Sequence, residues 1–211
     1  MAHYFVHQHI AHYSPQDIEA LKELLVKFYY QNWVAEQKEP KKQTNCNIIK
    51  ALKEKQSVRY IASIVVKKYL DDKNITQRFK ENLQDSKLYE KHKKASKNSW
   101  LKPVLILVEY SMSDDPRPKR IEKNDFHVEH ILPQNPDPSS QWVKDFSEEK
   151  RELYTHSLAN LTLLGGKKNS QASNLDFKDK KKIYMGEEIK KIPRVMTCYK
   201  MTIDIAHKYT E

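Results

Sequence analysis

Residues 125–134 read DFHVEHILPQ, and this short stretch decides how the rest of the chain is interpreted. It places His127, Glu129 and His130 next to one another and then reaches Pro133, which cannot donate a backbone hydrogen bond to a sheet. The stretch predicts a short strand that ends near the proline. Because alternate side chains of a strand share a face, we expect His127 and Glu129 to project together and His130 to point elsewhere.

These three side chains are suited to phosphodiester hydrolysis. A glutamate carboxylate holds hard divalent cations such as Mg²⁺ or Mn²⁺, and a neutral imidazole binds softer ones. A histidine that is free of metal can take a proton from water near neutral pH. Hydrolysis needs both a cation and a base. Ordinary surface polarity produces similar clusters, and the spacing is not the HExxH of zinc proteases, so the stretch alone leaves both interpretations open.

A second set of polar residues follows about thirty positions later. Asn160 opens the segment NLTLL at 160–164, which predicts a second strand ending at Gly165-Gly166. Asn169 follows this turn, Asn174 lies just beyond it, and a polar helical segment comes next. An amide oxygen can ligate a metal or orient an imidazole, although asparagine is also common in turns. The sequence therefore predicts a compact β–loop–β–α unit.

The chain before this unit has helical periodicity. Ser14 is expected to cap a helix over 14–36, Thr44 or Asn45 to begin a second, and Ser57 to cap a third. An apolar segment, NSWLKPVLILVEYSM, predicts a buried helix that is interrupted near Pro103. We expect a helical region at 1–120, the compact unit at 121–190 and a C-terminal helical segment at 191–211. The polar residues 113–125 are the expected linker.

Composition narrows the class of protein. The 211 residues carry a net charge of +10, which favours a polyanion as partner. Only two cysteines are present, so a cysteine-based zinc site is not expected. The longest apolar run, VLILV at 104–108, is far shorter than a membrane span, and the N-terminal residues lack the pattern of a signal peptide. We therefore expect a cytoplasmic protein with no membrane partner.

The two motifs together resemble a known family. HVEHILPQ, followed by LANLTLLGGKKNSQASNLDFKDKK, is similar to the HNH (ββα-metal) nuclease domain of the GmrSD type, the C-terminal part of modification-dependent restriction and phage-defence proteins. The resemblance implies a mainly α fold that carries a small ββα-metal nuclease unit. It also implies a metal-dependent DNA endonuclease that acts in bacterial restriction or anti-phage defence.

The resemblance implies a role for each matching residue. His130 would be the general base that activates water. Glu129 and Asn169 would be metal ligands, and His127 would be either a further ligand or a group that supports one. Asn160 would orient His130 or brace the ββα unit. The glutamate at 129 has a longer reach than aspartate, which affects the geometry of the metal.

The resemblance also implies cofactors and partners. The metal would be Mg²⁺ or Mn²⁺ rather than Zn²⁺, and Lys168, Lys180 and Asn174 would contact DNA. Larger members carry a nucleotide-hydrolysing domain with a DGQQR-like motif, and neither that motif nor a GxxxxGK loop occurs here. We therefore expect an NTP-hydrolysing sensor domain or subunit as partner. A chain without that sensor would cut DNA with little selectivity for modified bases.

Three other interpretations are open. The chain could be a DNA- or partner-binding module whose nuclease site has decayed, or a nuclease that acts on RNA. A structural zinc site built from His127, His130 and His156 is the third, and it predicts unfolding on chelation. Trp142 is expected to pack its helix onto the two strands rather than to stack on bases.

Overall fold

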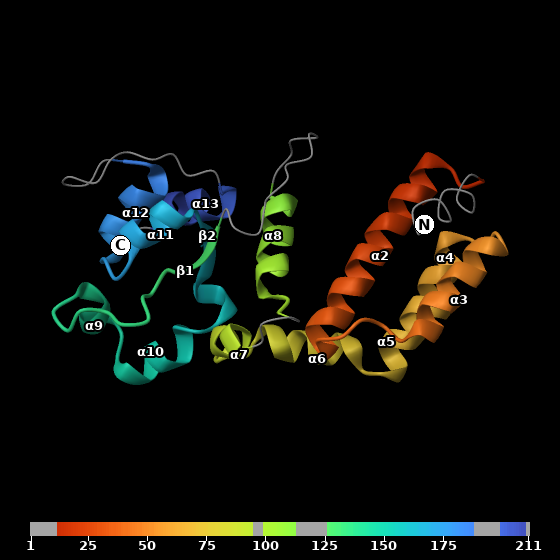
Figure 1. The fold of residues 1–211 in the computed structure, drawn as a ribbon, viewed down its shortest axis with the longest axis horizontal. Helices are drawn as coiled ribbons and strands as arrows, with labels where there is room; N and C mark the ends of the chain where they lie inside the picture. The colour runs from red at the N-terminus through yellow and green to blue at the C-terminus, as the bar shows by residue number, and fades with distance from the viewer. Residues whose placement is uncertain (1–11, 95–98, 113–125, 188–198, 210–211) are drawn as a thin grey trace. The chain divides into compact units, whose positions relative to one another are not determined.

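The computed structural model describes residues 12–94, 99–112, 126–187 and 199–209 (Figure 1). The chain divides into two compact units, Met1–Leu83 and Gln84–Glu211. The domain boundaries expected at 120/121 and 190/191 fall at residues outside the described ranges, and so does the expected linker at 113–125.

The first unit is helical. Its elements are α2 (Pro15–Glu36), α3 (Lys42–Lys53), α4 (Val58–Tyr60), the π-helical segment η1 (Ile61–Lys67), α5 (Lys68–Asp72) and α6 (Ile75–Leu83). Ser14 caps α2 as predicted, because its hydroxyl accepts a hydrogen bond from the Asp17 amide at 3.1 Å. Ser57 caps α4 in the same way, through the amide of Tyr60.

The second helix begins earlier than predicted. α3 starts at Lys42 instead of Thr44 or Asn45, and no side chain caps it. Thr44 and Ile48 are buried one turn apart, so the buried face of α3 already includes its first turn. Burial of that face holds the helix without a cap, since tertiary packing supplies most helix stability.

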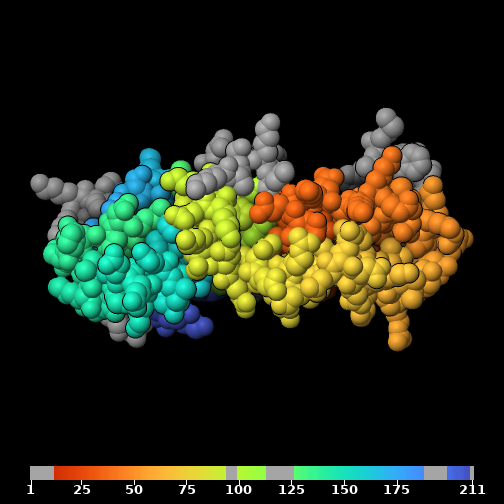
Figure 2. All heavy atoms as spheres, turned by 90° about the horizontal axis from the view of Figure 1, so that it is seen from below, coloured from red at the N-terminus to blue at the C-terminus, as the bar shows by residue number. Residues whose placement is uncertain are grey.

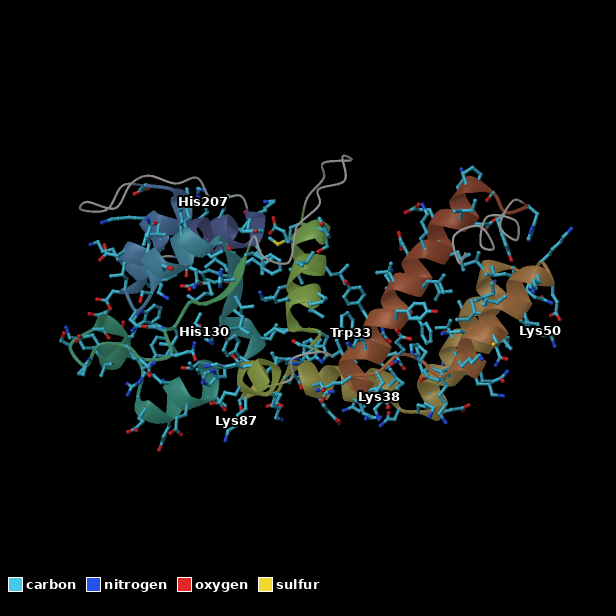
Figure 3. All side chains as sticks on the ribbon, viewed as in Figure 1. Trp33, Lys38, Lys50, Lys87, His130 and His207 are labelled. Atoms are coloured by element: carbon cyan, nitrogen blue, oxygen red, sulfur yellow. The ribbon has the colours of Figure 1, made fainter. Side chains whose placement is uncertain are left out.

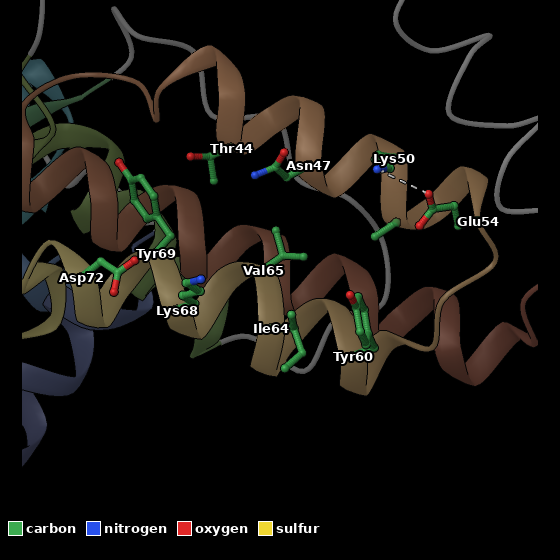
Figure 4. Close-up of a pocket in the computed structure, with 11 residues that line it drawn as sticks. Thr44, Asn47, Lys50, Glu54, Tyr60, Ile64, Val65, Lys68, Tyr69 and Asp72 are labelled. Carbon is green, nitrogen blue, oxygen red and sulfur yellow. Dashed lines mark ion pairs between the residues drawn. The ribbon is translucent and has the colours of Figure 1, made fainter.

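A shallow polar cavity of about 380 Å³ lies between α3 and the helices that follow it (Figure 4). Polar groups on its rim include Asn47 and an ion pair between Lys50 and Glu54 at 3.7 Å. Ile64 and Tyr60 contribute half-exposed apolar surface. The cavity is open and mixed in character.

The second unit contains the predicted hairpin. Its elements are α7 (Leu88–Lys94), α8 (Leu101–Ser111), β1 (His127–His130), α9 (Gln141–Asp145), α10 (Glu148–Tyr154), the 3₁₀ turn η2 (Leu158–Asn160), β2 (Leu161–Leu164), α11 (Gly166–Ala172), α12 (Phe177–Met185) and α13 (Lys200–Lys208). β1 and β2 pair antiparallel, with His127 opposite Leu164 and His130 opposite Leu161. The fold is mainly helical with a two-stranded hairpin followed by helices, as the sequence predicted.

One local prediction was wrong. α8 is continuous and is not interrupted at Pro103, because the proline is its third residue and a first-turn amide needs no partner within the helix. The packing of Trp142 onto the strands stays a prediction, and the contacts described for Trp142 tie α9 to the start of α12. Its indole N–H donates to the Leu175 carbonyl at 2.9 Å, and its ring lies against Phe177 at the start of α12.

α13 closes the unit against β2 and α8. Thr162 of β2 and Thr202 of α13 are both fully buried, and their hydroxyls lie 2.8 Å apart. The Glu109 carboxylate of α8 accepts hydrogen bonds from the amides of Lys200 and Met201, at 2.7 and 2.9 Å. A distant carboxylate therefore caps the N-terminus of α13, where a negative charge is favoured.

Among the described residues, no helix has both the length and the apolar character needed to span a membrane.

Candidate active site

Asn160 joins the two halves of the hairpin motif. Its Oδ1 accepts a hydrogen bond from the Leu132 amide at 2.6 Å, and its Nδ2 donates to the carbonyls of Leu132 and Thr155 at 2.8 and 2.9 Å. These bonds fix the chain just after His130. The geometry therefore matches the bracing role, one of the two roles that the sequence suggested for this asparagine.

His130 ends β1 among aromatic and polar side chains. The ring of Tyr89 meets it edge-on at 4.3 Å between centroids, and the ring of His156 lies 5.6 Å away. Gln134 places its Nε2 at 3.4 Å from His130 Nδ1. The other ring nitrogen, Nε2, is buried and has no hydrogen-bond partner among the described residues. A buried polar atom without a partner is costly and indicates a place for water or ligand.

The surroundings keep His130 uncharged. Burial lowers the pKa of its imidazole to about 3, and the positive charges of His156, Lys180 and Lys93 act in the same direction. A neutral imidazole keeps one nitrogen with a free lone pair, which is the form that accepts a proton. The site thus holds His130 in its neutral form over the whole neutral pH range, and a pKa this low also makes the imidazole a weaker base than a free one.

A cavity of about 580 Å³ lies next to residues that neighbour His130, among them Tyr89, Gln134 and His156. It is lined by Tyr89, Glu90, Lys93, Gln134, Asn135 and His156. These residues come from α7, from the loop after β1 and from the turn after α10, and the Tyr89 amide joins two of these segments by donating to the His156 carbonyl at 2.9 Å. Figure 3 shows His130 at the end of β1 that lies toward α10, and Figure 2 shows the surfaces of α7 and α10 side by side.

Glu129 and His127 were expected to project together, but they lie in different environments, since His127 is exposed and Glu129 is buried. It is buried, and its Oε1 accepts hydrogen bonds from Lys180 Nζ at 2.7 Å and from the Tyr184 hydroxyl at 3.0 Å. Lys180 also donates to the His130 carbonyl at 2.6 Å. These bonds attach α12 to β1 from inside the core.

Burial dominates the protonation of this network. It raises the pKa of Glu129, and the attraction of Lys180 only opposes this shift. Burial likewise lowers the pKa of Lys180 against the attraction of Glu129, and it raises the pKa of Tyr184 well above its ordinary value. Each shift favours the uncharged form of its group, as expected for ionisable groups in a dry interior.

The predicted metal ligands fit a divalent cation only in part. Asn169 fits, since its Oδ1 is buried without a hydrogen-bond partner among the described residues. His127 lies beside the start of the same helix, with its Nε2 3.2 Å from the position that a Cβ on Gly166 would take. Glu129 as paired here does not fit, because its Oε1 already accepts hydrogen bonds from Lys180 and Tyr184, and burial favours its uncharged form.

The predicted zinc site is not supported. In the part of the chain that the structure describes, no group of three or more histidine, cysteine, aspartate or glutamate side chains is placed to hold a metal ion. His127 is exposed beside Gly166, whereas His130 and His156 meet Tyr89. The three histidines therefore do not form one set of zinc ligands among the described residues.

The lysines predicted to contact DNA are buried. Lys180 is fully enclosed at Glu129, and Lys168 is 4% exposed and donates to the Ile183 carbonyl. A phosphate of the DNA backbone does not reach either group in this conformation. Asn174, in the turn after α11, is exposed as a DNA contact requires.

The sequence contained a signal for the burial of Lys180. This lysine stands three and four positions before Ile183 and Tyr184, which puts all three on one face of α12. Reading that face as the core side would have placed Lys180 inside. No comparable local signal points to Tyr89 and Lys93, because they reach His130 from α7, about forty positions away in the chain.

Comparison with known proteins gives one match. The family described as GmrSD restriction endonucleases, C-terminal domain, matches residues 36–210, which include both strands and all the site residues described above. No curated protein and no solved structure matches the chain.

Proposed function

The chain belongs to the family of GmrSD restriction endonucleases, C-terminal domain, and from this premise we propose that it hydrolyses DNA phosphodiester bonds with a divalent metal ion. The family implies a nuclease of restriction systems with DNA as its substrate. The net charge of +10 supports a polyanionic substrate.

One observation carries the proposal, and it is the state of His130. Its imidazole is neutral, it neighbours residues that line a cavity, and its Nε2 lacks a protein partner among the described residues. His130 would take the proton of a water molecule as that water attacks phosphorus. Asn160 would keep the base in place, because its hydrogen bonds to Leu132 hold the chain that follows.

We propose that Asn169 and His127 hold the metal ion. Asn169 contributes an amide oxygen, which suits Mg²⁺ and Mn²⁺, and His127 contributes an imidazole, which suits Mn²⁺ better. A bound cation supplies stabilisation of negative charge on the phosphate. Asn174 would contact the DNA backbone from the neighbouring turn. The proposal extends to a cytoplasmic protein that works with an NTP-hydrolysing sensor and, without it, cuts with little selectivity for modified bases.

Cleavage of supercoiled plasmid tests the proposal. The wild-type chain would be compared with His130→Ala and with His207→Ala, in Mg²⁺, in Mn²⁺ and in EDTA. His207 is an exposed histidine of α13 and serves as the matched control. We expect metal-dependent nicking or cutting that is lost in His130→Ala and kept in His207→Ala.

Two outcomes would contradict the proposal. Equal cleavage by wild type and His130→Ala would remove His130 as the base. Binding of DNA without cleavage in any metal would support a decayed site instead. Competition between DNA and RNA of the same sequence distinguishes the two substrates, and preferential cleavage of RNA would replace DNA in the proposal.

A further inference from the structure

Two of the three groups whose positive charge lowers the pKa of His130, Lys93 and His156, lie outside the hairpin motif. Of the two lysines that the motif supplies near the site, Lys168 bonds to the Ile183 carbonyl and Lys180 to Glu129. Positive charge that acts on His130 also comes from Lys93 of α7 and from His156 after α10. Lys93 and His156 are therefore better placed to contact DNA than Lys168 and Lys180, to which the sequence assigned that role.

Lys93 and His156 face one space. Both line the cavity of about 580 Å³ beside His130, together with Tyr89 and Gln134, which contact the His130 ring directly. Lys93 is exposed, so its ammonium group is open to a ligand. His156 has a buried Nδ1 without a hydrogen-bond partner among the described residues, as His130 has a buried Nε2. His156 lines the cavity and His130 contacts residues that line it, so the two unpaired atoms indicate a polar ligand in this region.

We propose that this cavity receives the scissile phosphate of DNA, and that Lys93 and His156 contact its non-bridging oxygens. The inference rests on the proposed endonuclease function and names the substrate contacts of the same site. A phosphate here would lie beside His130, as attack by a water that His130 activates requires. Charge-assisted bonds from an ammonium group and an imidazole are the contacts that phosphate oxygens favour.

Glu90 gives the cavity an opposing charge. Its Oε1 lies 3.6 Å from His156 Nε2, and its side chain is half-exposed at the cavity wall. A carboxylate there repels the DNA backbone and competes for His156. Replacing Glu90 by glutamine is therefore expected to tighten DNA binding, the opposite of the effect expected for Lys93 and His156.

Binding of a short DNA duplex in EDTA tests the inference separately from cleavage. Lys93→Gln, His156→Gln and Glu90→Gln would be compared with wild type and with Lys91→Gln. Lys91 is on the same helix as Lys93, is exposed, pairs with Asp85 and does not line the cavity. The affinity would be measured at several salt concentrations, and circular dichroism would show that each variant is folded.

We expect Lys93→Gln and His156→Gln each to weaken binding about tenfold, the usual loss for a bond to a charged group. Lys93→Gln should also reduce the slope of log affinity against log salt by about 0.9, the value for one phosphate contact. Lys91→Gln should keep most of the affinity, and Glu90→Gln should gain affinity.

Equal binding by Lys93→Gln, His156→Gln and the Lys91→Gln control would overturn the inference. If wild type cleaves plasmid in that case, the proposed function stands and only the phosphate contacts are wrong. If wild type binds DNA through Lys93 and His156 but does not cleave it, the proposed function is wrong and the contacts stand.

Discussion

Replacing Asn160 by alanine should destabilise the second unit by about 3 kcal/mol. The change removes three hydrogen bonds, two to Leu132 and one to Thr155. Both partners are buried, at 4% and 7% exposure, so water does not replace the lost bonds. Each bond contributes about 1 kcal/mol net, and a buried partner left unpaired costs more. A whole domain has only about 5–15 kcal/mol of stability, so the loss is large.

Urea unfolding followed by tryptophan fluorescence measures this effect. Trp100 and Trp142 belong to the second unit and report its unfolding. With a slope of about 2 kcal/mol per molar urea, the midpoint should fall by about 1.5 M. Asn174→Ala is the matched control, since this asparagine is exposed. Asn160→Ala with the same midpoint as Asn174→Ala would refute the reasoning that these bonds hold the loop after β1.

Three further predictions concern charge. Lys180→Met leaves Glu129 buried without its cation, so the free energy of unfolding should fall by about 3–5 kcal/mol at pH 8. This loss of stability should become smaller as the pH falls, because burial raises the pKa of Glu129, so that the carboxylate is protonated in the folded state before it is protonated in the unfolded state. A loss of stability that does not change with pH would contradict this. Folded His130 has a pKa of about 3 against an ordinary 6.5, so the unfolded state binds the extra proton between these values. The free energy of unfolding should therefore decrease as the pH falls through that window, by at most about 1.4 kcal/mol per pH unit. The decrease should be less steep in His130→Gln, and urea titrations at several pH values would measure it. Glu109→Gln weakens the cap of α13 and should cost about 1–2 kcal/mol, with hydrogen exchange of the Lys200 and Met201 amides faster than in wild type.

Much of the fold followed from local signals. Ser14 and Ser57 cap helices because a serine hydroxyl accepts a hydrogen bond from the free amide three residues later. A serine just before a helical repeat of apolar residues can be recognised from the sequence alone. The hairpin was predicted from two short segments, FHVEHIL and NLTLL, that end at proline and glycine. The start of α3 was misplaced because burial rather than a cap fixes it. Pro103 was misjudged because its place within the helix decides whether a proline interrupts it.

The sequence by itself determined which residues meet at the hairpin. Register and alternation put His127, Glu129 and His130 on one strand, and the chain returns with Asn160 beside it, because strand geometry is local.

Only the tertiary structure decided what each of these groups does. Glu129 faces a core where Lys180 and Tyr184 hydrogen-bond to it. Lys180 is inside rather than on DNA because the face of α12 that carries Ile183 and Tyr184 packs into the core with Leu164 of β2. His130 stays neutral because residues from α7 and from the turn after α10 enclose it. Burial and the charge of distant neighbours set protonation, and neither is a property of a residue's own stretch of sequence.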